Sequence, residues 1–323
     1  MKEIGTIGVL TSGGDAPGMN AAIRSVVRTA IYNNMRVMGI RRGYDGLVHG
    51  DVFEMNARDV SDILHRGGTI LQTARCKDFK EVETVRRAIS TARYFGIDAL
   101  VVIGGDGSFR GARDLSVEGM PTIGLPGTID NDIAYTDYTI GFDTAVNTAI
   151  EAVDKIRDTA SSHRRCNIVK VMGRNSGMIA LNVGIATGAE AILIPEAEFN
   201  LELDLIKPIK DGARRNKKHF IIILAEGFKF DGDLSKTIEE NTGIETRETI
   251  LGYIQRGGSP TAMDRVVASQ MGSRAVELLI AGVGNRIIGM RDNKVYDIDI
   301  IEGLDMKNSP RQDLIDLSKV LSI

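Results

Sequence analysis

Three aspartates stand beside glycines or beside each other, in a pattern typical of phosphoryl transfer. Asp106 lies in the run GGDGS at residues 104–108, and Asp130 and Asp132 lie two residues apart in LPGTIDND. If these strand ends are neighbours, the converging carboxylates repel one another unless a cation neutralises them. Mg²⁺ suits such a site because it takes few carboxylates and completes its shell with water and phosphate oxygens. Alternatively, one of the pair is a base toward a hydroxyl, or both only form Asx turns and helix caps.

Two glycine-rich turns stand between an aliphatic run and a helix-like segment. They are TSGGDAPGMN at residues 11–20 and VVIGGDGS at residues 101–108. A turn of this kind presents free N–H groups and the positive end of a helix dipole to an anion. Neither turn fits G-x-x-x-x-G-K-[ST] or G-x-G-x-x-G, which weakens the usual NTPase and Rossmann interpretations. The remaining interpretations are phosphate binding and a purely structural role in tight connections.

Five arginines at the predicted ends of elements form a second group: Arg75, Arg165, Arg174, Arg247 and Arg256. The planar guanidinium grips a phosphate with two hydrogen bonds, so a cluster of arginines on loops suits a second, phosphorylated ligand. For each arginine taken alone, a surface salt bridge is the favoured interpretation.

Short aliphatic runs must position these turns. They occur at residues 7–10, 37–40, 99–103, 122–125, 168–172, 192–194 and 220–225. Continuous rather than alternating hydrophobicity predicts strands covered on both faces. Between them lie helix-period segments, such as the apolar stripe within residues 142–153. The alternation predicts an α/β protein with parallel or mixed sheets flanked by helices, whose loops gather at one sheet edge.

Composition excludes several classes of protein. The 323 residues suggest two domains at about 150 residues each. Forty basic against 43 acidic residues give a net charge of −3, which argues against a nucleic-acid or membrane binder that works by bulk positive charge. Two cysteines are too few for a disulfide framework. With no signal-peptide pattern and no run of about 18 apolar residues, we expect a soluble, cytoplasmic protein.

Together the motifs resemble the bacterial ATP-dependent phosphofructokinases almost end to end. The matching blocks are TSGGDAPGMNAAIR (11–24), RGGT and TAR (66–75), VVIGGDGS (101–108), GLPGTIDNDI (124–133), YTIGFDTA (138–145), VMGR (171–174) and IQRGGSP (254–260). The resemblance implies a larger ATP-binding domain (1–141 plus 255–305), a smaller fructose 6-phosphate domain (142–254 plus 306–323) and an active site in the cleft between them.

The resemblance also implies a glycolytic kinase that moves the γ-phosphoryl group of ATP to the 1-hydroxyl of fructose 6-phosphate. Asp130 would accept the hydroxyl proton with help from Asp132, and Asp106 would hold Mg²⁺, mainly through water. The transferring group would be stabilised by Gly14, Arg75 and Thr128. ATP would be bound by Gly14, Arg75, Cys76, Gly105, Asp106, Gly107, Ser108 and Gly111.

Fructose 6-phosphate would be bound by Thr128, Asp130, Arg165, Met172, Gly173, Arg174, Glu226, Arg247, Tyr253 and Arg256. In the family, Arg165 and Arg247 reach across from a neighbouring subunit, so the resemblance implies a homotetramer. Tyr253 replaces the usual histidine; its phenol can donate to phosphate but cannot become cationic near neutral pH, which puts sugar-phosphate affinity in doubt.

An effector pocket for ADP or phosphoenolpyruvate is also implied, with Glu190 as its Mg²⁺ ligand. Its residues would be Arg24, Arg28, Arg157, Glu190, Arg214, Lys217 and Lys218. Ala57 replaces a further family arginine, so the allosteric response is expected to be weak or absent. Without the resemblance, residues 214–218 read as a solvated helix end.

Three alternatives remain. Relatives that use pyrophosphate carry Asp at the position of Gly107 and Lys at that of Gly127, so the two glycines favour ATP. An NAD kinase would explain residues 101–108 but not the Thr128–Asp132 block or the arginines. A silent paralogue that only senses nucleotide and sugar phosphate is opposed by the intact Asp106, Asp130 and Arg75.

Overall fold

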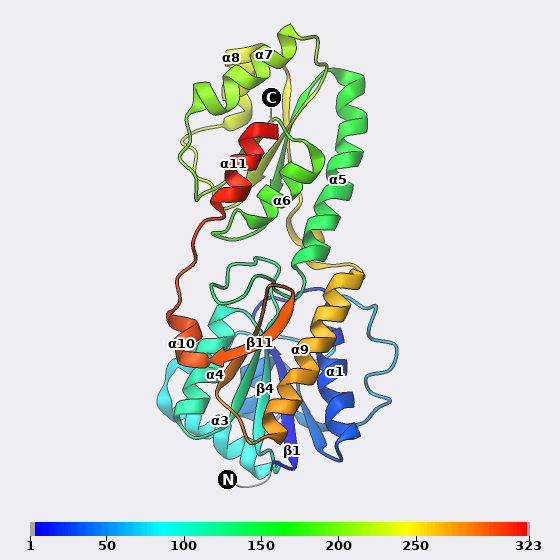
Figure 1. The fold of residues 1–323 in the computed structure, drawn as a ribbon, viewed down its shortest axis with the longest axis vertical. Helices are drawn as coiled ribbons and strands as arrows, with labels where there is room; N and C mark the ends of the chain where they lie inside the picture. The colour runs from blue at the N-terminus through cyan, green and yellow to red at the C-terminus, as the bar shows by residue number, and fades with distance from the viewer. Residues whose placement is uncertain (1–3, 322–323) are drawn as a thin grey trace. The chain divides into compact units, whose positions relative to one another are not determined.

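The structure, a computed structural model, describes residues 4–321. Its contacts divide the chain into two units (Figure 1). Unit 1 comprises the residues up to 129, then 133–144 and 256–308, and unit 2 comprises 130–132, 145–255 and the residues from 309 on. The chain therefore enters unit 2 more than once. In the described part of the chain, no helix is long and apolar enough to cross a membrane.

Unit 1 is built on a seven-stranded sheet within the described residues, in the order β11-β10-β5-β4-β1-β2-β3. The strands are β1 (Thr6–Ser12), β2 (Arg36–Ile40), β3 (Val52–Met55), β4 (Ala99–Gly104), β5 (Thr122–Pro126), β10 (Arg286–Arg291) and β11 (Lys294–Asp299). The edge strands β3 and β11 are antiparallel to their neighbours, and the remaining pairs are parallel. The predicted α/β class with mixed and parallel sheets is confirmed.

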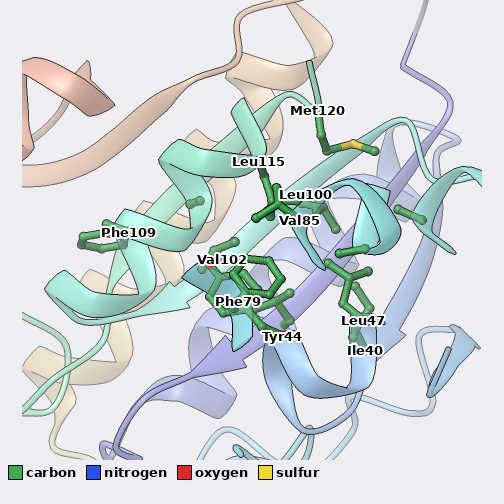
Figure 2. Packing of buried hydrophobic residues seen from close by; sticks show 14 of the residues in the cluster. Ile40, Tyr44, Leu47, Phe79, Val85, Leu100, Val102, Phe109, Leu115 and Met120 are labelled. Carbon is green, nitrogen blue, oxygen red and sulfur yellow. The ribbon is translucent and has the colours of Figure 1, made fainter. Parts of the chain in front are cut away.

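Helices cover both faces of this sheet and bury its aliphatic side chains. They are α1 (Met19–Tyr32), α2 (Gly43–His49), α3 (Val82–Tyr94), α4 (Asp106–Val117), α9 (Ala262–Ile280) and α10 (Ile300–Asp305), with a short 3-10 turn at Lys77–Lys80. Every residue of β1 and β4 is buried, as their unbroken hydrophobic runs predict. On one face, Tyr44 stacks on Phe79 at 4.1 Å between ring centroids and packs with Leu100 and Val102 of β4 and Leu115 of α4 (Figure 2).

Unit 2 holds a four-stranded parallel sheet in the order β7-β8-β6-β9. Its strands are β6 (Cys166–Val171), β7 (Ala191–Leu193), β8 (Phe220–Ala225) and β9 (Thr246–Ile250), and its helices are α6 (Met178–Thr187), α7 (Lys207–Arg214), α8 (Leu234–Thr242) and α11 (Gln312–Leu321). A π-helical turn covers Leu201–Ile206, and a 3-10 turn covers Gly252–Arg256. Helix α5 (Phe142–His163) begins in unit 1 and continues into unit 2 (Figure 1). Its predicted apolar stripe is buried except at Ile150, which is partly buried.

Candidate active site

Three strand ends of unit 1 lie side by side in register. Ser12 of β1 pairs with Gly104 of β4, and Gly104 pairs with Pro126 of β5. The two glycine-rich turns and the LPGTIDND segment therefore leave the sheet at one edge, as predicted. This edge includes the point between β1 and β4 where the strand order reverses, which is where open α/β sheets bind ligands.

The first turn favours glycine at residues 13 and 18 and brings the backbone of Gly14 close to an arginine side chain. Gly13 and Gly18 have φ of 87° and 105°, in the left-handed region that glycine favours. A Cβ on Gly14 would collide with the guanidinium of Arg256, which donates a 3.5 Å hydrogen bond to the backbone oxygen of Asp15. Gly18 precedes α1, and no side chain caps that helix, so this turn leaves backbone N–H groups available to an anion.

The second turn contains one enclosed glycine and one open glycine. A Cβ on Gly104 would lie 2.4 Å from both Ser108 Oγ and the backbone oxygen of Ser12, so only glycine fits between the two turns. A Cβ on Gly107 would meet no heavy atom within 4 Å. A ligand can therefore approach the backbone of Gly107 closely. The buried Ser108 is fixed by its own backbone oxygen, which accepts a hydrogen bond from the Tyr44 hydroxyl.

Asp106 opens helix α4 and is half exposed. Its carboxylate accepts a 3.0 Å hydrogen bond from Nε of Arg110, one helical turn later. Among residues 4–321, no group of three or more His, Cys, Asp or Glu side chains is placed to hold a metal ion. A single accessible carboxylate beside glycine-rich turns nevertheless fits Mg²⁺, which binds through one or two carboxylates, waters and substrate phosphates rather than an all-protein cage.

The third turn is anchored by backbone and hydroxyl groups. Gly127 N–H donates to the Gly104 oxygen at 3.0 Å, and Thr128 N–H donates to the Ile140 oxygen at 3.1 Å. The Thr139 hydroxyl donates to the Thr128 oxygen at 2.7 Å. These bonds fix Thr128, and Asp130 follows two residues later. The Asp130 residue is only 3% exposed.

Within unit 2, Asp130 meets one of the predicted sugar-binding arginines. Its Oδ2 lies 3.7 Å from Nε of Arg174, whose side chain is 65% exposed. Asp132 is partly buried. The structure thus places a buried carboxylate and an exposed cation together, which is an arrangement suited to a phosphorylated substrate with a reacting hydroxyl.

The loop after β6 that carries Arg174 is shaped by two polar side chains. Glu226 accepts hydrogen bonds from the N–H groups of Gly173 (3.2 Å) and Arg174 (2.6 Å). Gln255, which is fully buried, accepts one from Met172 N–H at 2.8 Å. Gly173 has φ of 139°, and a Cβ there would lie 2.5 Å from the Ser176 oxygen. Sequence reasoning did not assign a role to Gln255, although it lies inside the IQRGG motif.

Arg165 and Arg247 share one carboxylate. Nε of Arg165 donates to Glu245 at 2.8 Å because β6 and β9 are adjacent, and Nε of Arg247, two residues after Glu245, donates to it at 3.0 Å. Hydrogen bonds from these two arginines hold the pKa of Glu245 below its ordinary value. Tyr253 lies in the following 3-10 turn and is 82% exposed. The sequence did not single out Glu245.

Arg75 and Cys76 lie in unit 1, directly before the 3-10 turn at Lys77–Lys80. Arg75 is exposed, whereas Cys76 packs against the buried cluster around Tyr44. Burial, followed by the negative charges of Asp45 and Asp78, raises the pKa of the Cys76 thiol. The thiol therefore stays protonated near neutral pH, as a packed rather than a nucleophilic cysteine does.

Comparison with known proteins now decides the family. A family model described as "Phosphofructokinase" matches residues 6–279. The chain belongs to the phosphofructokinase family. Among curated phosphofructokinases, the "ATP-dependent 6-phosphofructokinase" of Clostridium botulinum is 57% identical over 317 residues, covering 98% of this chain and 99% of that relative. The protein of the same name from Alkaliphilus metalliredigens is 56% identical over 318 residues, with the same two coverages.

A solved phosphofructokinase from Saccharomyces cerevisiae has the same fold. It matches with a TM-score of 0.86 and 36% sequence identity over 98% of this chain. This chain spans about half of the longer yeast chain, at 48% of its length. The predicted phosphofructokinase-like fold is therefore confirmed for each of the two units.

The residues predicted for the phosphofructokinase effector pocket fall into two groups. On α1 of unit 1, burial and the nearby Arg28 lower the pKa of Arg24. In unit 2, Lys217 forms an ion pair with the buried Glu190, and Arg157 donates to the Thr187 oxygen.

The charged residues of the unit 2 group affect the pKa of His219. Burial, and then the charge of Arg157, lower the pKa of His219, with a further lowering by Lys217 that Glu190 opposes. The remaining two predicted residues are exposed: Arg214 pairs with Asp211 at 3.1 Å, and Lys218 lies at the end of the same segment.

The two glycines that favoured ATP have different surroundings. The space in front of Gly107 is open, whereas a Cβ on Gly127 would lie 3.0 Å from Ile103 and 3.2 Å from Met19. A lysine at Gly127 would therefore require these core side chains to move. Gly111 is enclosed as well, because a Cβ there would lie 2.7 Å from the Tyr44 ring.

Proposed function

We propose that this chain transfers the γ-phosphoryl group of ATP to the 1-hydroxyl of fructose 6-phosphate, giving fructose 1,6-bisphosphate and ADP. The observation that carries the proposal is the register of Ser12, Gly104 and Pro126, which brings two glycine-rich turns and the Thr128 segment to one sheet edge. The curated names of relatives at 57% identity support ATP as donor and fructose 6-phosphate as acceptor.

In this mechanism Asp130 is the base. The 1-hydroxyl oxygen attacks the γ-phosphorus, the bond from the γ-phosphorus to the β–γ bridging oxygen breaks, and Asp130 takes the hydroxyl proton. Asp132 supports Asp130. Charge on the transferring group is stabilised by the backbone of Gly14, by Arg75 and by Thr128, since positioning and electrostatics supply most of the catalysis in phosphoryl transfer.

The remaining residues hold the two substrates. Gly105, Gly107, Ser108, Gly111 and Cys76 border the nucleotide. Met172, Gly173, Arg174 and Glu226 hold the sugar, and Arg165, Arg247, Tyr253 and Arg256 bind its 6-phosphate. Mg²⁺ would be held by Asp106 through water and would neutralise charge on the ATP phosphates.

The deciding experiment is initial-rate phosphorylation of fructose 6-phosphate with Mg²⁺, with ATP or pyrophosphate as the sole donor. Turnover with ATP alone supports both the donor and the acceptor. Turnover with pyrophosphate alone contradicts the ATP assignment, and no turnover with either donor favours a silent sensor or another sugar phosphate.

We further propose that the chain works as a homotetramer whose subunits exchange Arg165 and Arg247. Support comes from the exposed apolar side chains beside Arg247, since Ile250 and Tyr253 are 67% and 82% exposed. A contiguous apolar surface exposed to solvent is typical of protein interaction sites. Light scattering on the purified protein tests the assembly, and a monomer that is fully active would contradict it.

The effector proposal concerns ADP or phosphoenolpyruvate bound by the two groups of residues described above. Glu190 is already neutralised by Lys217, and Ala57 offers no cation, so we expect a weak response. Fructose 6-phosphate saturation curves with and without each effector test this. The two free cysteines are consistent with a reducing cytoplasm, where we place the enzyme.

A further inference from the structure

Asp264 is a fully buried carboxylate with four hydrogen-bond donors around it. It lies in the first turn of α9 and accepts bonds from the Tyr138 hydroxyl (2.7 Å), Gly141 N–H (2.6 Å), Thr144 N–H (2.9 Å) and the Thr144 hydroxyl. All four donors belong to one segment, residues 138–144. Asp264 lies outside the residues proposed to bind either substrate.

The Thr144 hydroxyl ties this segment to α9 a second time. It donates to Asp264 and accepts a 3.0 Å hydrogen bond from Thr261 N–H, and Thr261 is the residue that caps α9. Segment 138–144 is thus fixed to the start of α9 through both residues.

The same segment supports the turn that leads to the proposed base. Ile140 N–H donates to the Pro126 oxygen at 2.8 Å, and Thr128 N–H donates to the Ile140 oxygen at 3.1 Å. The Thr139 hydroxyl also donates to the Thr128 oxygen. The path from Asp264 to Thr128 is therefore short, and Asp130 follows Thr128 by two residues.

On its other side, the segment packs against the first glycine-rich turn. A Cβ on Gly18 would lie 2.6 Å from Ile140 and 3.5 Å from Cβ of Asp264, and a Cβ on Gly141 would lie 2.7 Å from Cβ of Ala16. These close approaches show that residues 16–18 pack directly against segment 138–144, with no room for an added side chain between them. Movement of the segment would therefore displace both turns.

We propose that Asp264 is a positioning residue for phosphoryl transfer, which sets the place of Thr128 and of the first glycine-rich turn by holding segment 138–144. The inference rests on the proposed function. A carboxylate is required because each of its oxygens accepts from a backbone N–H, which can only donate: an asparagine would set its own NH₂ against Gly141 N–H or Thr144 N–H. Burial raises the pKa of Asp264, and these hydrogen bonds oppose that rise.

The test compares Asp264→Asn with wild type at a temperature well below the Tm of either protein. We expect kcat to fall by about a hundredfold, as displacement of a reacting group by about 1 Å does, with the fructose 6-phosphate KM within about twofold. Asp297→Asn is the matched control, because Asp297 also accepts bonds from two partners, Arg274 and Arg286, but lies on the edge strand β11. It should lower Tm without lowering kcat.

Thr144 provides a milder pair of variants should Asp264→Asn fail to fold. Thr144→Ser keeps the hydroxyl and should retain kcat, whereas Thr144→Val keeps the shape, loses both hydroxyl bonds and should lower kcat by about tenfold. Equal kcat in the two variants, or an unchanged kcat in a folded Asp264→Asn, overturns the inference.

A readout independent of activity separates this inference from the proposed function. Hydrogen exchange at residues 126–144 should accelerate by about tenfold in Asp264→Asn, while exchange in β8 stays unchanged. Acceleration throughout the protein would indicate general destabilisation and would overturn the positioning role. A wild-type protein without kinase activity refutes the proposed function, and the exchange result then decides alone whether Asp264 orders the segment.

Discussion

Nε of Arg174 lies 3.7 Å from Oδ2 of Asp130, so a nearly buried carboxylate is accompanied by a cation that is mostly in solvent. This difference in exposure between Asp130 and Arg174 suits a site that binds and releases a charged substrate. The carboxylate is held still by the turn around it, while the long arginine side chain can rotate toward an incoming phosphorylated substrate. In the proposed mechanism, substrate binding would draw Arg174 from Asp130 to the ligand, and Asp130 would then accept the hydroxyl proton.

Replacing Asp130 with asparagine should preserve nucleotide binding and remove most turnover. The amide has nearly the same shape but cannot accept the hydroxyl proton, so we expect kcat to fall by about a thousandfold. Steady-state rates and titration of ATP by calorimetry measure the two effects. Asp231→Asn, at an exposed loop position of the same unit, is the control. A variant with near-normal kcat would disprove the role of base.

Replacing Tyr253 with histidine should lower the KM for fructose 6-phosphate. Histidine can carry a positive charge near neutral pH, and the change is expected to be about fivefold, equivalent to about 1 kcal/mol. Because Tyr253 is 82% exposed, Tm should change little. Tyr253→Phe, which removes only the hydroxyl, should raise KM. If neither variant alters KM, Tyr253 does not touch the phosphate.

Replacing Gly107 with aspartate should weaken ATP binding without unfolding the protein. The added Cβ meets no atom within 4 Å, and an acidic residue in the first turn of α4 is favourable for the helix dipole. The new charge would face the ATP phosphates, so we expect the KM for ATP to rise by at least about tenfold. Gly107→Ala controls for bulk alone. An unchanged ATP KM in the aspartate variant would place the nucleotide elsewhere.

Replacing Glu245 with glutamine should reduce stability in a pH-dependent way. The pKa of Glu245 is depressed by hydrogen bonds from Arg165 and Arg247, so its stabilising effect is present above its ordinary pKa of 4.5 and is lost as pH falls through the lower folded value. The Tm difference between wild type and variant should therefore shrink from about pH 6 to about pH 3. A difference that grows on acidification would contradict the assigned hydrogen bonds.

The sequence predicted most of the buried strands, although not β10, whose four central residues are buried. Seven aliphatic runs became β1, β2, β4, β5, β6, β7 and β8. Four strands were not predicted: β3, β9, β10 and β11. Strand β9 reads TRETI and is mostly exposed, and the sheet-edge strand β11 reads KVYDID and is partly exposed. Hydrophobic continuity does not detect such strands, because their stability depends on pairing with a neighbour that lies far away in sequence.

The meeting of the three turns was predictable for a similar reason. Parallel strands place their carboxyl ends at one edge, whatever the connecting segments do. The hydrogen-bond partners were not predictable. Asp264 lies 120 residues or more from its donors along the chain, and Glu245 lies 80 residues from Arg165, so no local spacing relates them. The roles assigned to individual site residues stay predictions until the variants above are measured.

The shared register of Ser12, Gly104 and Pro126 fixes the spacing between the three turns that follow these residues. Neighbouring strands are about 4.8 Å apart, so the three turns cover about 10 Å at fixed intervals, a span comparable to a chain of phosphate groups. Loops elsewhere can change in length with little consequence. A single-residue deletion in β4, in contrast, would displace its turn by one residue relative to the turns after β1 and β5. It would also exchange the side chains on the two faces of the strand. Strand length here is therefore constrained by chemistry as well as by packing.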